Sequence, residues 1–109
     1  MAKTINISYG GANYTLEFTR RTVAKLEENG FNLNQLGEKP ATMLPQLFEG
    51  AFLAHHRMTK NDIVWEIFSN IKDKEALMQK LAEMYVEPIE TLFEEPEDNE
   101  KNAVWEATF

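Results

Sequence analysis

The stretch that decides the fold runs from Thr4 to Phe18 and reads TINISYGGANYTLEF. Apolar side chains alternate with polar ones on both sides of the pair Gly10-Gly11, as in a strand that buries one face. Glycine tolerates the positive φ that a tight hairpin turn needs. The stretch therefore predicts a β-hairpin over residues 4–18. Because a lone hairpin is marginal in water, its apolar face must pack on helices or on another chain.

The residues that follow predict a first helix from about Arg20 to Asn29. Thr19 precedes it as a typical N-cap residue, whose hydroxyl accepts from an early backbone N–H. Gly30 fits the left-handed position just beyond the C-cap. This places Leu26 and Phe31 in the apolar contact that accompanies a Schellman ending. Both ends of this helix are therefore marked in the sequence.

A second helix is predicted over residues 43–56, after a connector in which Gly37 and Pro40 interrupt any regular element. Pro45 is expected in its first turn, where the missing N–H is not needed. The helix has a wide apolar face, which includes Met43, Leu47, Phe48 and Phe52. Two interpretations stay open. The face is buried in the core, or part of it binds another subunit or an unfolded partner, since methionine repacks easily.

Two more helices are predicted over residues 60–69 and 74–93. Thr59, with Asp62 three residues later, indicates a capping box for the first of them. Asp73 is the N-cap candidate for the second.

The predicted fold is therefore mainly α with an N-terminal β-hairpin, an α+β class. Its small body has four to five helices, because Pro88 is expected to kink the last helix or split it in two. Residues 1–95 are expected to form a single globular domain, as the length of 109 residues indicates. Residues 96–109 are expected to be an acidic, flexible tail.

Charge is divided unevenly along the chain. Residues 1–82 carry a formal charge of +1 and residues 83–109 carry −8. Much of the excess lies in an acidic segment, residues 94–100, after which the chain recovers two aromatic side chains, Trp105 and Phe109. Acidic runs with little apolar content do not fold alone, whereas aromatic side chains are common interface anchors. Trp105 and Phe109 are therefore predicted to bind a partner, unless the tail folds back on its own body.

Composition argues against several classes of protein. The chain has no cysteine, which excludes disulfides, thiolate metal sites and a cysteine nucleophile. No stretch approaches the roughly 18 apolar residues of a membrane span, and the N-terminus lacks the apolar region of a signal peptide. We therefore expect no membrane partner. The negative balance also argues against nucleic-acid binding, which needs a basic face.

We expect no residues to combine into a catalytic, cofactor or metal site, although Asp62 and Glu66 lie near the chain's two histidines in sequence. His55 and His56 are adjacent on a predicted helix and point about 100° apart, so they cannot share a metal ion as an i, i+4 pair does. Neighbouring carboxylates such as Glu27-Glu28 lack the apolar pocket that general acid–base catalysis needs. The chain is therefore expected not to be an enzyme, and to hold no cofactor and no metal.

Arg20, Arg21 and Lys25 form a small basic cluster on the first predicted helix. One interpretation is an ordinary solvated face. The other is a docking patch for an acidic segment, such as the tail of a neighbouring copy. Opposite charges would steer that contact, and salt would weaken it.

Five segments carry a resemblance to a known family: Tyr14 to Arg21, Lys25 to Phe31, Leu47 to Phe52, Ile63 to Ile67, and Leu81 to Tyr85. In their layout they resemble the small tail assembly chaperones of long-tailed phages, in the version found in phages and prophages of Gram-positive bacteria. The resemblance covers roughly residues 4–93, and it contains no catalytic signature.

The resemblance implies a mostly helical, self-associating chaperone that binds the tape measure protein and recruits tail tube subunits. It implies a place in the cytoplasm of the infected or lysogenic bacterial host and absence from the mature virion. Two alternatives stay open. One is a small acidic protein that inhibits a host nucleic-acid-binding protein by imitating the phosphate charge of nucleic acid. The other is a structural subunit of the tail.

Overall fold

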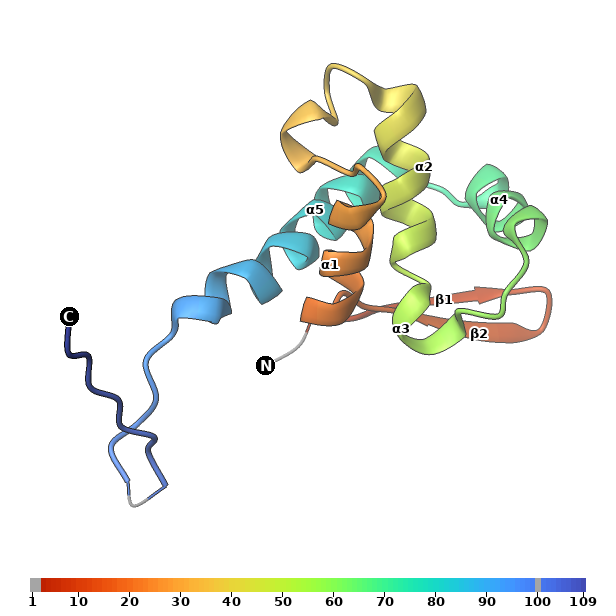
Figure 1. Cartoon of the computed structure of the whole chain (residues 1–109). Coiled ribbons are helices and arrows are strands. Elements are labelled where there is room, and N and C mark those ends of the chain that lie inside the picture. Colours follow the sequence, from red (N-terminus) through yellow and green to blue (C-terminus); the bar gives the residue numbers. More distant parts are fainter. Residues whose placement is uncertain (1–2, 100) are drawn as a thin grey trace.

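The computed structural model describes residues 3–99 and 101–109 and has the predicted α+β fold class. In that part of the chain, a two-stranded antiparallel hairpin is followed by five α-helices and two short 3₁₀-helices, which are labelled η (Figure 1). The elements are β1 (Ile5–Tyr9), β2 (Ala12–Leu16), α1 (Arg20–Glu28), η1 (Leu33–Gln35), α2 (Pro40–Gly50), α3 (Leu53–His56), α4 (Asn61–Asn70), α5 (Lys74–Glu90) and η2 (Thr91–Phe93).

The hairpin forms within one chain, as its sequence pattern allows. Tyr9 lies opposite Ala12, so the turn consists of Gly10 and Gly11 alone. Their φ angles are 58° and 81°, and two positive values are what a two-residue type I′ turn requires. Leu16 at the end of β2 is fully buried. The alternating pattern therefore places one face of the hairpin against the helices, as predicted.

Both predicted ends of α1 are confirmed. The Thr19 hydroxyl accepts from the Thr22 N–H at 3.2 Å, and Oγ1 of Thr22 accepts in return from the Thr19 N–H at 2.9 Å. At the other end Gly30 has a φ of 90°, and the Phe31 N–H donates to the Leu26 carbonyl at 2.9 Å. Leu26 and Phe31 are both buried. Local signals therefore suffice to begin and end this helix.

The predicted helix over residues 43–56 is wrong at its start and in its continuity. Helix α2 begins at Pro40, because proline suits the first helical position, and it ends at Gly50. The Ala51 carbonyl then accepts the Glu17 N–H at 3.0 Å, next to the hairpin. The Phe52 N–H donates to the Glu49 carbonyl at 3.1 Å, an i→i−3 bond that tightens the end of α2. Since the Ala51 carbonyl is bonded to Glu17, it does not accept from the His55 N–H, and α3 follows as a separate short helix.

Two prolines lie inside helices. Since α2 begins at Pro40, Pro45 falls in its second turn rather than its first, which corrects the prediction. Pro88 lies in the last turn of α5, and the helix continues through it to Glu90. The predicted split at Pro88 is therefore wrong, because a proline so near the helix end removes only one of the last helical bonds.

Of the two further N-caps that the sequence predicts, one is wrong and the other is confirmed in its position. The N-cap of α4 is Lys60 rather than Thr59, because the Lys60 carbonyl already accepts from the Val64 N–H at 3.1 Å. Asp73 does stand at the N-cap position of α5, but it is left-handed, with a φ of 58°, and its side chain makes no capping bond. Asp tolerates this conformation better than most residues.

The helices pack around one connected cluster of buried apolar side chains. Helices α1, α2 and α5 contact one another, and α3 contacts β2 (Figure 1). Helix α4 is tied to the hairpin where the Asn70 side-chain amide donates to the Tyr9 hydroxyl at 3.2 Å. The largest fully buried side chains come from four different elements: Leu16, Leu47, Phe48, Ile67 and Leu81.

Beyond the body, the chain projects outward from the end of α5 (Figure 1). We call residues 89–109 the C-terminal arm. The arm makes the molecule elongated, with extents of 56 × 32 × 25 Å. Its acidic segment includes Glu100, which lies outside the described residues. That the tail is flexible stays a prediction. In the part of the chain that the structure describes, no helix is at once long and apolar enough to cross a membrane.

Candidate interaction surface

The apolar face predicted on the second helix is part of the core. Met43, Leu47, Phe48 and Phe52 are between 0% and 4% exposed. The Phe48 ring meets the rings of Phe52 and Phe68 edge to face, with centroids 5.3 and 5.1 Å apart. The structure thus agrees with the first of the two interpretations, burial in the core. It corrects the prediction that these four side chains bind a partner, because they offer no surface.

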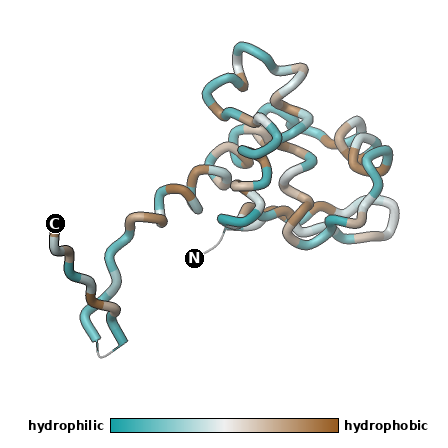
Figure 2. Tube along the Cα trace, in the orientation of Figure 1, coloured by the Kyte–Doolittle hydropathy of each residue, from teal (hydrophilic) through white to brown (hydrophobic). Residues whose placement is uncertain are grey.

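Exposed apolar side chains gather instead on the C-terminal arm. Eight large hydrophobic residues are exposed in the described part of the chain, and six of them follow Pro88. Those six are Ile89, Leu92, Phe93, Val104, Trp105 and Phe109. Figure 2 shows hydrophobic stretches at the end of α5 and again in the last part of the arm, with hydrophilic chain between them. Exposed apolar residues gathered in this way mark interaction sites, whereas scattered ones do not.

The predicted anchors Trp105 and Phe109 lie on this arm. Trp105 is 84% exposed and Phe109 is fully exposed, so neither packs on the body. The structure therefore does not support the alternative in which the tail folds back on the body. Whether these side chains bind a partner stays a prediction.

Between its two apolar parts the arm carries a local turn. The Lys101 N–H donates to the Asn99 side-chain oxygen at 2.8 Å, and the Asn102 side-chain amide donates to the Glu97 carbonyl at 3.1 Å. Asparagine side chains commonly replace backbone partners in turns of this kind. The acidic segment therefore links two apolar stretches and adds no apolar surface of its own.

A second candidate surface lies between α1 and α3. A groove of about 360 Å³ is lined by Arg21, Thr22, Ala24, Lys25, Glu28, Leu53 and Arg57, and we call it the basic groove. Arg21 and Lys25 from the predicted basic cluster belong to it. Arg20, the third member of that cluster, points elsewhere: its Nη2 donates to the Thr91 carbonyl at 2.9 Å, where the arm leaves the body.

The two adjacent histidines fasten the hairpin to α3. His56 Nε2 accepts the Thr15 N–H at 2.9 Å, on the side of β2 that faces away from β1. His55 Nε2 lies 2.6 Å from Oε1 of Glu17. The two rings therefore bind different partners. In residues 3–99 and 101–109, no group of three or more His, Asp or Glu side chains is placed to hold a metal ion.

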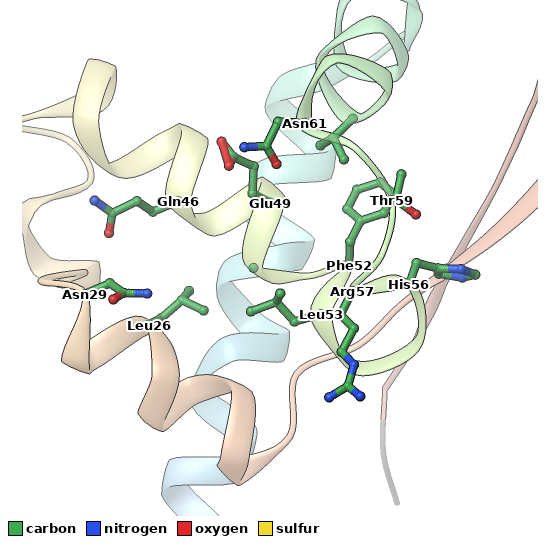
Figure 3. Close-up of a pocket in the computed structure, with 12 residues that line it drawn as sticks. Leu26, Asn29, Gln46, Glu49, Phe52, Leu53, His56, Arg57, Thr59 and Asn61 are labelled. Carbon is green, nitrogen blue, oxygen red and sulfur yellow. The ribbon is translucent and has the colours of Figure 1, made fainter.

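A small cavity of about 210 Å³ lies among α1, α2, α3 and the start of α4 (Figure 3). Leu26 and Leu53 point toward one another in it, and polar side chains such as Gln46 and Asn61 surround it. Gln46 Oε1 is buried and accepts no hydrogen bond from a described residue. The volume is below the roughly 300–1,000 Å³ of usual ligand sites. The cavity is therefore suited to water or a very small polar molecule.

Two tyrosines have shifted acidity. Burial raises the pKa of Tyr85 above its ordinary value, and the charge of Glu27 raises it further. Burial also raises the pKa of Tyr9, with an added contribution from the charge of Glu66 and a hydrogen bond to it. Both tyrosines stay neutral near pH 7, so they add no charge to either surface.

Sequence reasoning missed two parts of these surfaces. Ile89, Leu92 and Phe93 read as the apolar face of a helix, although their position next to an acidic run was a usable signal that they leave the body. Arg57 had no such signal, because it joins Lys25 only through the packing of α3 beside α1.

Comparison with known proteins gives one match. A family model described as a domain of unknown function (DUF5055) matches residues 1–109. No curated protein and no solved structure matches the chain.

Proposed function

We propose that this chain, which belongs to the DUF5055 family, is a non-enzymatic assembly chaperone of phage tails that binds the tape measure protein and recruits tail tube subunits. One observation carries the proposal: among the described residues, six of the eight exposed large apolar side chains lie on an arm that projects from a body with a buried core. The proposal rests on the resemblance for the identity of the client and on the arm for the means of binding.

The arm has the chemistry that such a client requires. A long apolar helix in water needs apolar contacts along its length, and Leu92, Phe93 and Trp105 are free to supply them. The acids between these residues keep the complex soluble through net charge. Several copies along one client would add avidity without any single tight site.

The proposed contact residues differ from those that the sequence indicated. Met43, Leu47, Phe48 and Phe52 are core residues and are not proposed again. Trp105 and Phe109 remain, and Leu92 and Phe93 join them because they are exposed on the same arm.

The acidic inhibitor is the weaker candidate. Imitating nucleic acid requires acids spread over a folded face, whereas here much of the excess negative charge lies on the arm. Salt separates the two functions. Binding through phosphate-like charge collapses at high salt, whereas apolar binding to a tape measure helix persists.

Co-expression tests the proposal. The full chain is produced together with the tape measure protein of the same phage or prophage, and the soluble fraction of that protein is measured. We expect Phe93→Ser and Trp105→Ala to lower this fraction, because each removes an exposed apolar anchor. Met58→Ser is the matched control, since Met58 is 87% exposed on the body while Phe93 is 91% exposed on the arm.

An unchanged soluble fraction with Phe93→Ser and Trp105→Ala, or an equal loss with Met58→Ser, would contradict the proposal.

The proposed place of action has its own test. The chain should be found in the cytoplasm of the host during tail assembly and should be missing from purified particles. Its presence in particles in a fixed ratio would favour a structural tail subunit.

A further inference from the structure

The basic groove between α1 and α3 is lined by both apolar and cationic side chains. Ala24 and Leu53 are its apolar lining residues, and Arg21, Lys25 and Arg57 are its cationic ones. Its volume of about 360 Å³ is within the range of sites that enclose a ring-sized group. A groove of this composition suits an apolar side chain with acids beside it.

The three cations that line this groove are free to bind such a group. Among the described residues, Arg21, Lys25 and Arg57 form no ion pair, whereas Lys3 and Lys80 each face a glutamate within 4 Å. One acid, Glu28, also lines the groove, so the lining keeps a net positive charge. Unpaired arginines beside apolar surface can pair with carboxylates and stack on aromatic rings.

The cationic surface extends beyond the groove itself. A wider hollow of about 630 Å³ adjoins it and shares Arg21, Leu53 and Arg57. Arg20 also lines this hollow, although its Nη2 already donates to the Thr91 carbonyl of its own chain. His55 also lines this hollow, but its Nε2 is already bonded to the Glu17 carboxylate. The positive strip therefore follows the first turns of α1 and can accompany a peptide over several residues.

The chain itself contains a segment of matching chemistry. Residues 94–109 hold six acidic residues and one basic residue. Trp105 stands among them, directly followed by Glu106, and its ring is 84% exposed. Trp and Arg are the residues most often found at the energetic centres of interfaces. Charge and residue composition thus match the basic groove to the C-terminal arm.

We propose that the basic groove of one copy binds the C-terminal arm of a second copy. Trp105 enters the groove against Ala24 and Leu53, and the acids of the arm face Arg21 and Arg57. Within one chain, no described residue of the arm lines the groove. Beyond Thr91, which accepts from Arg20, the arm projects outward past α5 (Figure 1). Because groove and arm are different surfaces, the contact is head-to-tail and produces a ring or an open chain of copies.

This inference goes beyond the proposed function and does not depend on the identity of a client. It also gives the apolar arm a partner before any client is present. An arm held in the groove of a neighbouring copy is shielded from water. A client that binds the arm more strongly releases it from that groove.

Analytical ultracentrifugation of the full chain tests the proposal over a wide range of concentration at low and high salt. We expect the wild type to associate as its concentration rises, and to do so more weakly at high salt. Trp105→Ala should weaken association roughly thirtyfold or more, as expected for an aromatic anchor. Arg57→Glu should abolish most of it, whereas Lys72→Glu, the same charge change at an exposed site outside the groove, should leave it intact.

A mixing experiment establishes the direction of the contact. Trp105→Ala leaves the groove intact and Arg57→Glu leaves the arm intact, so an equimolar mixture of the two should form pairs and go no further. Thermal melting of each variant checks that the body is folded. A wild type that is monomeric at every concentration overturns the proposal, and this includes the case in which each arm closes on its own groove. Association that both variants retain also overturns it.

Discussion

Phenylalanine side chains pack into the core of the body but are exposed on the C-terminal arm. Phe48, in α2, is fully buried and meets two other phenylalanine rings, whereas Phe93, in η2, is 91% exposed. Both lie in helical segments with apolar neighbours in sequence. What separates them is the presence of another element on the facing side. Apolar periodicity alone therefore says that a face must be covered, and it does not say whether the same chain covers it.

The largest difference should appear when the same truncation is made in both places. Phe48→Ala removes a fully buried ring and leaves a cavity, and it should lower the free energy of unfolding by about 3–5 kcal/mol. Phe93→Ala should change it by less than about 0.5 kcal/mol, as for other exposed sites. Urea unfolding followed by circular dichroism measures both. Similar values for the two variants would mean that the arm is part of the folded body.

The next comparison removes the same hydroxyl group at the N-cap of α1 and at the end of the arm. Thr19→Ala removes the hydroxyl that accepts the Thr22 N–H, and it should cost about 1 kcal/mol of stability. Thr108→Ala, the same change on the exposed end of the arm, should have no measurable effect. Thermal melting of the two variants side by side tests this, and an unchanged melting temperature for Thr19→Ala would show that the cap does not stabilise α1.

The loss of stability at alkaline pH should arise from tyrosines of the body alone. Burial raises the pKa of Tyr85 in the folded state, so above pH ~10 the unfolded chain loses this proton first. The stabilisation from the neutral Tyr85 side chain is complete below the pKa that this tyrosine has in the unfolded chain. At higher pH the free energy of unfolding falls as pH rises. Tyr85→Phe should make this fall shallower in denaturant titrations across that range. Tyr9 acts in the same direction and should keep part of the fall.

The smallest effect is expected from deleting residues 96–109. No described residue of the deleted segment belongs to the buried cluster, so the melting temperature should stay the same. The alkaline fall in stability should also persist, since the arm contains no tyrosine. A marked drop in melting temperature on deletion would show that the tail supports the body after all.

The sequence predicted most of the local structure because the signals act over a few residues. Alternation around Gly10-Gly11 specified the hairpin, and Thr19 and Gly30 specified the ends of α1. The end of α2 could not be predicted in this way. Next to that end the Ala51 carbonyl accepts the N–H of Glu17, and those residues meet only when the hairpin packs beside the helices.

The candidate surfaces were predictable in part. The acidic charge of the tail and the aromatic residue Trp105 were visible in the sequence, because composition needs no fold. That the face with Phe48 is core was left open, since burial depends on which elements lie opposite one another.

The sequence by itself therefore determined the elements of the body and the chemical contrast between body and tail, through local conformational preference and charge. Only the tertiary structure decided which apolar side chains remain exposed. It also joined Arg57 to Arg21 and Lys25 around one groove. The physical reason is that burial and charge clustering are properties of residues brought together in space, and no local pattern encodes the packing of α3 beside α1.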